Sequence, residues 1–85
     1  MKKYAVAILS FFDNQNKLFV VDAKTDTQAM IKTILAFKEE SGEDMNDADT
    51  LEWIEDMKEM TIEDIQQCLF DSDMSISKPT QIKYN

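Results

Sequence analysis

The 85-residue chain contains no arginine and no histidine, and it has one residue each of cysteine, glycine and proline. Histidine is the side chain that most often titrates near neutral pH and most often binds transition metals, so its absence removes the commonest catalytic and metal-ligating group. One cysteine excludes an internal disulfide framework and fits a reducing compartment. A zinc site would have to be built from carboxylates alone, and the sequence predicts neither a metal centre nor a cofactor site.

Long apolar runs are also absent. A membrane-spanning helix needs about 20 consecutive apolar residues, and no stretch approaches that length. Residues 1–3 followed by apolar residues have the outline of a signal peptide, but Phe12, Asp13 and Asn14 interrupt the run without a small-residue cleavage site. We therefore expect a cytoplasmic protein with no membrane partner.

Two segments at the start of the chain, residues 3–12 and 17–23, are rich in β-branched and aromatic residues. They flank the polar residues 13–16, and Asn and Asp favour turns because their side chains bond the local backbone and tolerate left-handed conformations. We predict an antiparallel hairpin over residues 3–23. Both faces of its first strand are apolar, with Tyr4, Val6, Ile8 and Phe12 on one and Ala5, Ala7, Leu9 and Phe11 on the other. Such a strand needs cover on both sides, from helices or from a second copy.

A first helix is expected over residues 26–41. Thr25 is a suitable N-cap, with Gln28 as the second half of a capping box, and Gly42 stands where a left-handed residue ends a helix. The expected inward stripe consists of Met30, Ile31, Ile34, Leu35 and Phe37, with Ala29, Lys32 and Ala36 behind it.

An acidic loop leads into a second helix, expected over residues 50–59. Its inward stripe is predicted to be Leu51, Ile54 and Met57, with Trp53 and Met60 at one margin. The opposite side carries Glu52, Glu55, Asp56 and Glu59. A calcium loop laid over residues 44–55 fails, because Ala48 stands where an oxygen ligand belongs and Asp49 where the turn requires glycine.

A third helix is expected over residues 62–70, with Thr61 and Asp64 forming its capping box. Its inward residues are predicted to be Ile62, Ile65, Cys68 and Leu69, which makes Cys68 a buried, inert thiol. Residues 75–84 alternate as a strand, with Ile76, Ile82 and Tyr84 on one face. Pro79 has no N–H, so this strand is an edge or begins after the proline.

This order of elements predicts a single α+β domain over residues 1–85 with topology β-β-α-α-α-β. The sheet is predicted to be three-stranded and antiparallel, with spatial order 2-1-3 and helices packed on it.

Charge is divided unevenly along the chain. Residues 1–38 contain six lysines and three acids, residues 39–73 contain fourteen acids and one lysine, and the formal net charge is −8. A field of this sign repels nucleic acid, so no direct nucleic-acid contact is expected. The acids of the second helix do not alternate with lysines, as they would on a helix surface with many ion pairs. Carboxylates about 5–6 Å apart along a helix also approximate the charge spacing of a phosphate backbone.

Two interpretations of the acidic segment stay open, namely plain solvation and recognition of a basic protein surface. If the segment binds a partner, the candidate residues are Glu43, Asp44, Asp47, Asp49, Glu52, Trp53, Glu55, Asp56, Glu59 and Glu63. Trp53 would be an aromatic anchor beside the charge, or part of the core.

A short, arginine-free, strongly acidic chain resembles the small accessory and counter-defence proteins of T-even-like bacteriophages. The resemblance rests on size and charge over the whole chain. It implies a non-enzymatic, antitoxin-like inhibitor that covers the basic, nucleic-acid-binding surface of a host nuclease, toxin or polymerase in the host cytoplasm. The alternative is a structural module that homodimerises through its sheet, with an acidic face that is only solvating.

Overall fold

The structure is a computed structural model that describes residues 1–11, 14–42 and 48–83. Its elements are β1 (Lys2–Ser10), β2 (Gln15–Ala23), α1 (Asp26–Glu40), α2 (Ala48–Met57), α3 (Ile62–Phe70), β3 (Met74–Ile76) and β4 (Thr80–Ile82). The strand order β2-β1-β3 confirms the predicted α+β fold, and β4 forms a fourth strand that also pairs with β1. All of these pairings are antiparallel.

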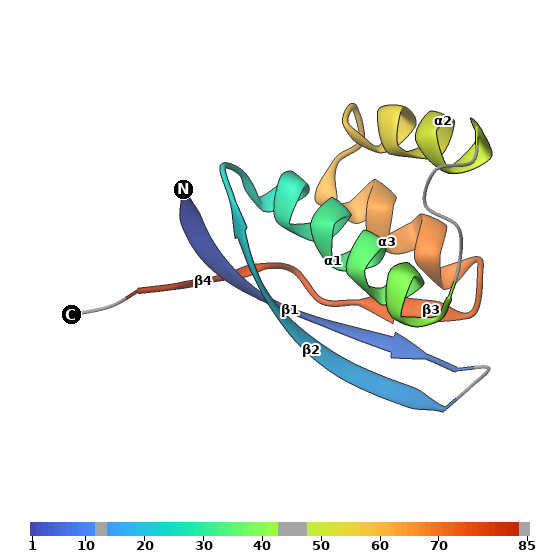
Figure 1. Ribbon diagram of the computed structural model, residues 1–85, viewed down its shortest axis with the longest axis horizontal. Helices are drawn as coiled ribbons and strands as arrows, with labels where there is room; N and C mark the ends of the chain where they lie inside the picture. Colours follow the sequence, from blue (N-terminus) through green and yellow to red (C-terminus); the bar gives the residue numbers. More distant parts are fainter. Residues whose placement is uncertain (12–13, 43–47, 84–85) are drawn as a thin grey trace.

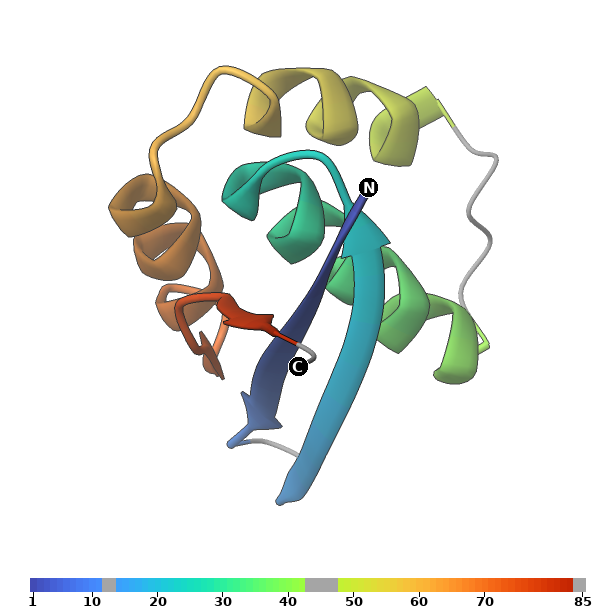
Figure 2. The same ribbon diagram turned by 90° about the vertical axis from the view of Figure 1, so that its left-hand side faces the viewer.

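The described helices lie on one side of the sheet, and the opposite face of the sheet has no helix on it (Figure 1). Figure 2 shows α1 nearest the strands, α3 beside it and α2 farthest from the sheet. Cover for the second face of β1 therefore does not come from the helices of the described chain.

Along strand β1, buried side chains alternate with half-buried ones. Tyr4, Val6 and Ile8 are buried on the helix side, with 2% or less of their surface exposed. Leu9 on the other side is half-buried, and across the ladder Leu18 and Val20 of β2 are 69% and 55% exposed. The outer face of the sheet is thus apolar and open.

The hairpin connection is shifted by two residues toward the N-terminus relative to the prediction, because β1 ends at Ser10 and β2 begins at Gln15. Gln15 pairs with Ser10 and Asn16 with Leu9, so both belong to β2 and not to the turn. Asn14 has φ 56°, the left-handed conformation expected of an Asx residue at this place. Phe12 and Asp13 lie outside the described residues.

Local capping determines both ends of α1. Thr25 Oγ1 accepts from the backbone N of Gln28 at 3.1 Å, as predicted. Gln28 Oε1 accepts from the backbone N of Lys24 at 2.6 Å. In the predicted capping box it would accept from the backbone N of Thr25, so the second hydrogen bond of the box is shifted by one residue. Gly42 has φ 84°, and its N donates to Glu39 O, which confirms its role in ending the helix.

The buried arc of α1 is wider than one stripe. Ala29, predicted to lie behind the stripe, is fully buried, and so is Thr33, whose hydroxyl donates to Ala29 O at 2.9 Å. Leu35 is only half-buried. The helix has the sheet on one side and the other two helices around it (Figure 2), so two of its sides meet the core.

The C-terminal segment forms two short strands where one was expected. Ser77 N donates to Ala7 O at 2.8 Å and Ser77 Oγ accepts from Ala7 N at 2.9 Å, so Ser77 occupies both backbone groups of Ala7. The link through Pro79 shifts the register by one residue: Ile76 is opposite Ile8, whereas Ile82 is opposite Lys3. Ile76 therefore faces the helices and Ile82 the outer side, and the prediction of one shared face is wrong. Tyr84 lies outside the described residues.

Candidate functional site

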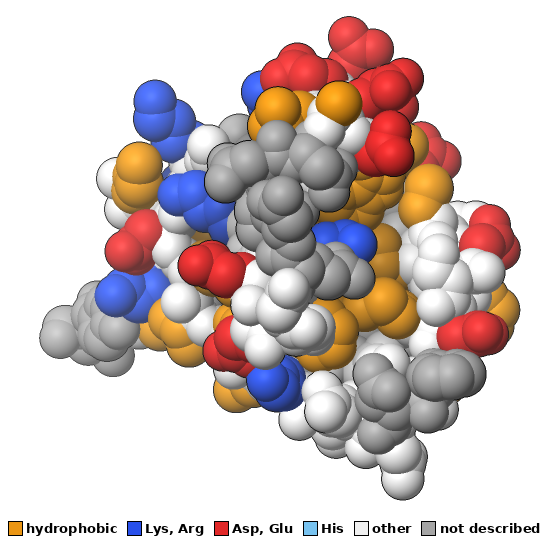
Figure 3. Space-filling view, turned by 45° about the vertical axis from the view of Figure 1, so that its right-hand side comes forward, with side chains coloured by type: hydrophobic (Ala, Val, Ile, Leu, Met, Phe, Trp, Pro, Cys, Tyr) orange, Lys and Arg blue, Asp and Glu red, His pale blue; other side chains and the backbone are white. Residues whose placement is uncertain are grey.

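The exposed acidic residues gather on the outer side of α2 and the start of α3. Helix α2 begins two residues before the predicted start and ends at Met57, and its acids point away from the core (Figure 3). The described members of the predicted site are exposed, apart from Trp53: Asp49, Glu52, Glu55, Asp56, Glu59 and Glu63. Glu43, Asp44 and Asp47 lie outside the described residues.

Lysines neutralise few of these carboxylates. Lys58 Nζ lies 2.7 Å from Glu55, and Lys78 Nζ lies 3.8 Å from Glu63. Asp49, Glu52, Asp56 and Glu59 have no lysine partner in the part of the chain that the structure describes. The outer side of α2, together with Glu59 just after its end, is thus a row of uncompensated negative charges, which we call the acidic helix face.

The inner side of α2 differs from the predicted stripe. Met57 is fully buried and Ile54 packs on the core, but Leu51 is 53% exposed, so its predicted inward position is wrong. Trp53 takes the inner position instead and packs against the core, with Lys38 Nζ 5.3 Å from its ring centroid. Trp53 is half-buried, and its indole ring covers more apolar surface than a leucine side chain would at this position. Trp53 therefore belongs to the side of α2 that packs on the core and not to the acidic helix face.

A cavity of 130 Å³ lies where the three helices meet. Its lining residues are Ile34, Lys38, Trp53, Cys68, Leu69, Ser72 and Met74. Cys68 is half-buried, its Sγ lies 4.0 Å from Met60 Sδ, and none of the described lining residues is a carboxylate that would act as a base. Apart from Lys38 and Ser72 the described lining is apolar, and its chemistry does not suit a nucleophilic site.

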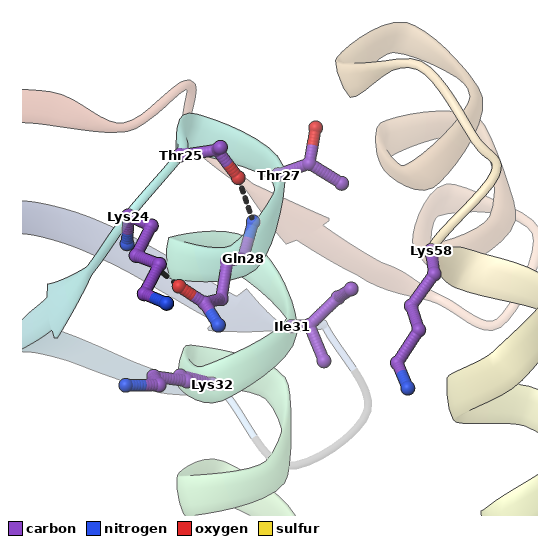
Figure 4. Close-up of a pocket in the computed structure, with 7 residues that line it drawn as sticks. All are labelled: Lys24, Thr25, Thr27, Gln28, Ile31, Lys32 and Lys58. Carbon is purple, nitrogen blue, oxygen red and sulfur yellow. Dashed lines mark hydrogen bonds between the residues drawn. The ribbon is translucent and has the colours of Figure 1, made fainter.

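A groove of 390 Å³ beside the start of α1 is basic, with Lys24, Lys32 and Lys58 among its lining residues (Figure 4). The three amines do not converge. Lys24 and Lys32 extend along one side of α1 and Lys58 lies across from the other side (Figure 4). Lys32 Nζ donates to Asp22 O at 2.5 Å and Lys58 Nζ to Glu55, so the groove does not form an anion cradle.

Positive charge collects at the other end of the molecule. Lys2, Lys3 and Lys83 line an open groove of 540 Å³ between the start of β1 and the end of β4. The start of β1 and the end of β4 lie on the left in Figure 1, far from α2. The molecule is polarised, with its acidic helix face and its lysine-rich groove apart from each other.

Among the described residues, no group of three or more Cys, Asp or Glu side chains is placed to hold a metal ion. None of the helices described is both long and apolar enough to span a bilayer. No protein-family model, curated protein or solved structure matches this chain, so function has to be argued from its own residues.

A second surface is the outer face of the sheet, which the sequence predicts as a possible dimer face without indicating its exposed residues. Its exposed apolar residues are Leu18 and Val20 of β2, next to Ala5, Ala7 and Leu9 of β1. The sequence feature that indicated this surface is the presence of apolar residues on both faces of β1. The structure leaves the surface open because the described helices all lie on the other side of the sheet.

Proposed function

We propose that this chain is a non-enzymatic binding protein whose acidic helix face covers a basic surface of a partner protein. One observation carries the proposal: Asp49, Glu52 and Asp56 of α2, and Glu59 just after its end, are exposed and have no lysine partner among the described residues, and buried Met57 holds the helix on the core. Interspersed lysines would be expected if the face were an ordinary solvated helix surface.

The partner that suits this face is a protein that itself binds nucleic acid. Carboxylates on successive helical turns present negative charge at intervals close to those of a phosphate backbone, and a basic cleft attracts either one. The lysine-rich groove lies away from α2 and does not compete for the acids. In a phage-type setting the partner would be a host nuclease, toxin or polymerase in the host cytoplasm.

A charge-reversal pair tests the proposal. After affinity capture from bacterial lysate and identification of the partner, its affinity is measured for the wild type and for the double variant Glu52→Lys with Asp56→Lys. We expect the double variant to bind at least about tenfold more weakly at low salt, mainly through a slower association rate, because exposed charges steer encounter. Duplex DNA should compete with the wild type for the same partner.

The matched control is Glu39→Lys with Asp71→Lys, which changes the net charge equally at two exposed acids outside α2. This control should bind as tightly as the wild type. Equal affinity of all three proteins would show that the acidic helix face is only solvating.

A second candidate function is supported by the open outer face of the sheet, where Leu18 and Val20 are exposed. We propose self-association through the sheet as this candidate, in a structural or assembly module. Association through apolar strands should resist salt, whereas capture of a basic partner should weaken steeply with it. Sedimentation from micromolar to millimolar protein tests this, and a single 9.9 kDa species throughout would contradict it.

A further inference from the structure

We propose that a second copy of this chain pairs with the open edge of β2, antiparallel and centred on Phe19, so that the two sheets become one. This inference rests on the second candidate function, self-association through the sheet, and it names the edge, the register and the residues involved.

The hydrogen bonds of β1 show which groups of β2 point outward. Ala7 directs its N–H and C=O toward Ser77, so the odd residues of β1 face β3 and β4 and the even residues face β2. In the observed register, odd residues of β2 complete this ladder, as Phe19 does with Val6. The even residues of β2 therefore direct their backbone groups away from the sheet.

Most of these outward groups are unpaired. Lys32 Nζ takes Asp22 O, but within the described chain no group bonds the outward N–H and C=O of Leu18 or Val20. The strand is nine residues long and contains no proline or glycine. An edge of this length and composition is a template for another strand.

The charges that usually protect such an edge are already engaged. Lys17 is paired with Glu40 and lies 5.9 Å from the Phe37 ring, and Asp22 is paired with Lys3 at 3.7 Å. A charged side chain on an edge strand opposes pairing because it repels like charges on an approaching strand or loses its own hydration. A charge that is already in an ion pair opposes pairing less. The exposed residues between them, Leu18 and Val20, are apolar.

The outward backbone groups of Leu18 and Val20 determine the register of pairing between the two copies, because these two residues lie symmetrically on either side of Phe19. Leu18 of one copy lies opposite Val20 of the other, and each of these two equivalent pairs exchanges both of its backbone hydrogen bonds. Asn16 then lies opposite Asp22 and Lys17 opposite Val21, so no like charges meet across the strands. Phe19 meets its own copy on the two-fold axis, where aromatic side chains pair favourably.

Charge favours a second copy as the occupant. The chain carries −8, and most of its surface repels another copy, but β2 has one lysine and one acid, both paired. In Figure 1, β2 begins at the bottom and passes below α1, whereas α2 lies at the top, so joining two copies through β2 keeps their acidic helix faces apart. A basic partner would find no net negative charge on β2 to bind.

Amide hydrogen exchange measured by NMR at several protein concentrations tests the pairing directly. We expect exchange at Leu18 and Val20 to slow as concentration rises and the sedimenting mass to double from 9.9 kDa. The amide of Phe19 is the internal control, since it already belongs to the β1–β2 ladder and should be protected at every concentration.

Two variants separate edge pairing from stacking of the open outer faces. Val20→Pro removes an N–H that the single copy does not use, so the fold should persist by circular dichroism while dimerisation is lost. Ala5→Lys places a charge on the outer face of β1 and should leave the edge dimer intact.

The opposite result, a dimer in Val20→Pro and none in Ala5→Lys, would overturn edge pairing and keep self-association. A wild type that stays monomeric at millimolar concentration, with fast exchange at Leu18 and Val20, would overturn both.

Discussion

At the scale of single residues, helical spacing assigns Ile34 and Leu51 to inward stripes alike, but only Ile34 is buried. Ile34 has 1% of its surface exposed, and Leu51 has 53%. The difference arises because α1 lies between the sheet and the other two helices, whereas α2 turns Trp53, Ile54 and Met57 toward the core and leaves Leu51 on its exposed side. Burial, and not residue type, should therefore decide the cost of truncating each side chain.

Replacing Ile34 with alanine should lower the free energy of unfolding by about 2–5 kcal/mol, because it leaves a cavity in the core. Leu51→Ala is the matched control and should change it by less than about 0.5 kcal/mol. Chemical denaturation measures both. An unchanged midpoint for Ile34→Ala, or equal losses in the two variants, would contradict the burial pattern.

At the scale of elements, a buried tyrosine ties the central strand to the first helix. Tyr4 of β1 is 2% exposed, and Asp26 is the first residue of α1. Burial raises the pKa of the Tyr4 phenol above its ordinary value of 10.0, and the nearby Asp26 carboxylate raises the pKa further. The native state thus holds this proton more tightly than the unfolded chain does.

This difference in pKa predicts the direction of a pH effect. The stabilisation should be complete below the unfolded pKa of 10.0 and should be lost as the pH rises from there through the higher native pKa. Tyr4→Phe removes the titrating group, so its stability should fall less steeply over this range than that of the wild type. Urea denaturation at a series of alkaline pH values measures the two slopes, and parallel slopes would contradict the coupling.

At the scale of the whole molecule, charge is the dominant asymmetry. The acidic helix face lies away from the lysine-rich groove, and four of its carboxylates have no lysine partner within residues 1–11, 14–42 and 48–83. Exposed ion pairs contribute little, so the few that exist do not offset the repulsion among the acids. Self-repulsion at −8 should therefore lower the stability of the compact state at low ionic strength.

Salt should consequently raise the Tm of this protein. Each 1 kcal/mol of relieved repulsion corresponds to about 4–8 °C for a domain of this size. The double variant Glu52→Lys with Asp56→Lys should show a smaller rise, because it has less repulsion to screen. Differential scanning calorimetry with increasing sodium chloride measures this, and a Tm that falls with salt would contradict it.

Features governed by near neighbours in the chain were predictable. Thr25, Gly42 and the Thr61–Asp64 box fixed helix ends because capping depends on residues a few positions apart. Exposure of the acids on α2 followed from charge alone. The inward position of Trp53 was not predictable, because it depends on where α2 meets α1 and α3. The open outer face depends likewise on where whole helices pack.

The one-residue shift between β3 and β4 has a consequence for changes in chain length. Because strand residues alternate sides, an even or odd number of residues in the link from Ser77 to Pro79 decides which side of the sheet Ile82 occupies. An insertion or deletion of one residue there would exchange inside for outside along β4, whereas a substitution would leave each side chain on its own side. The number of residues in this short link therefore matters more to the fold than which residues they are.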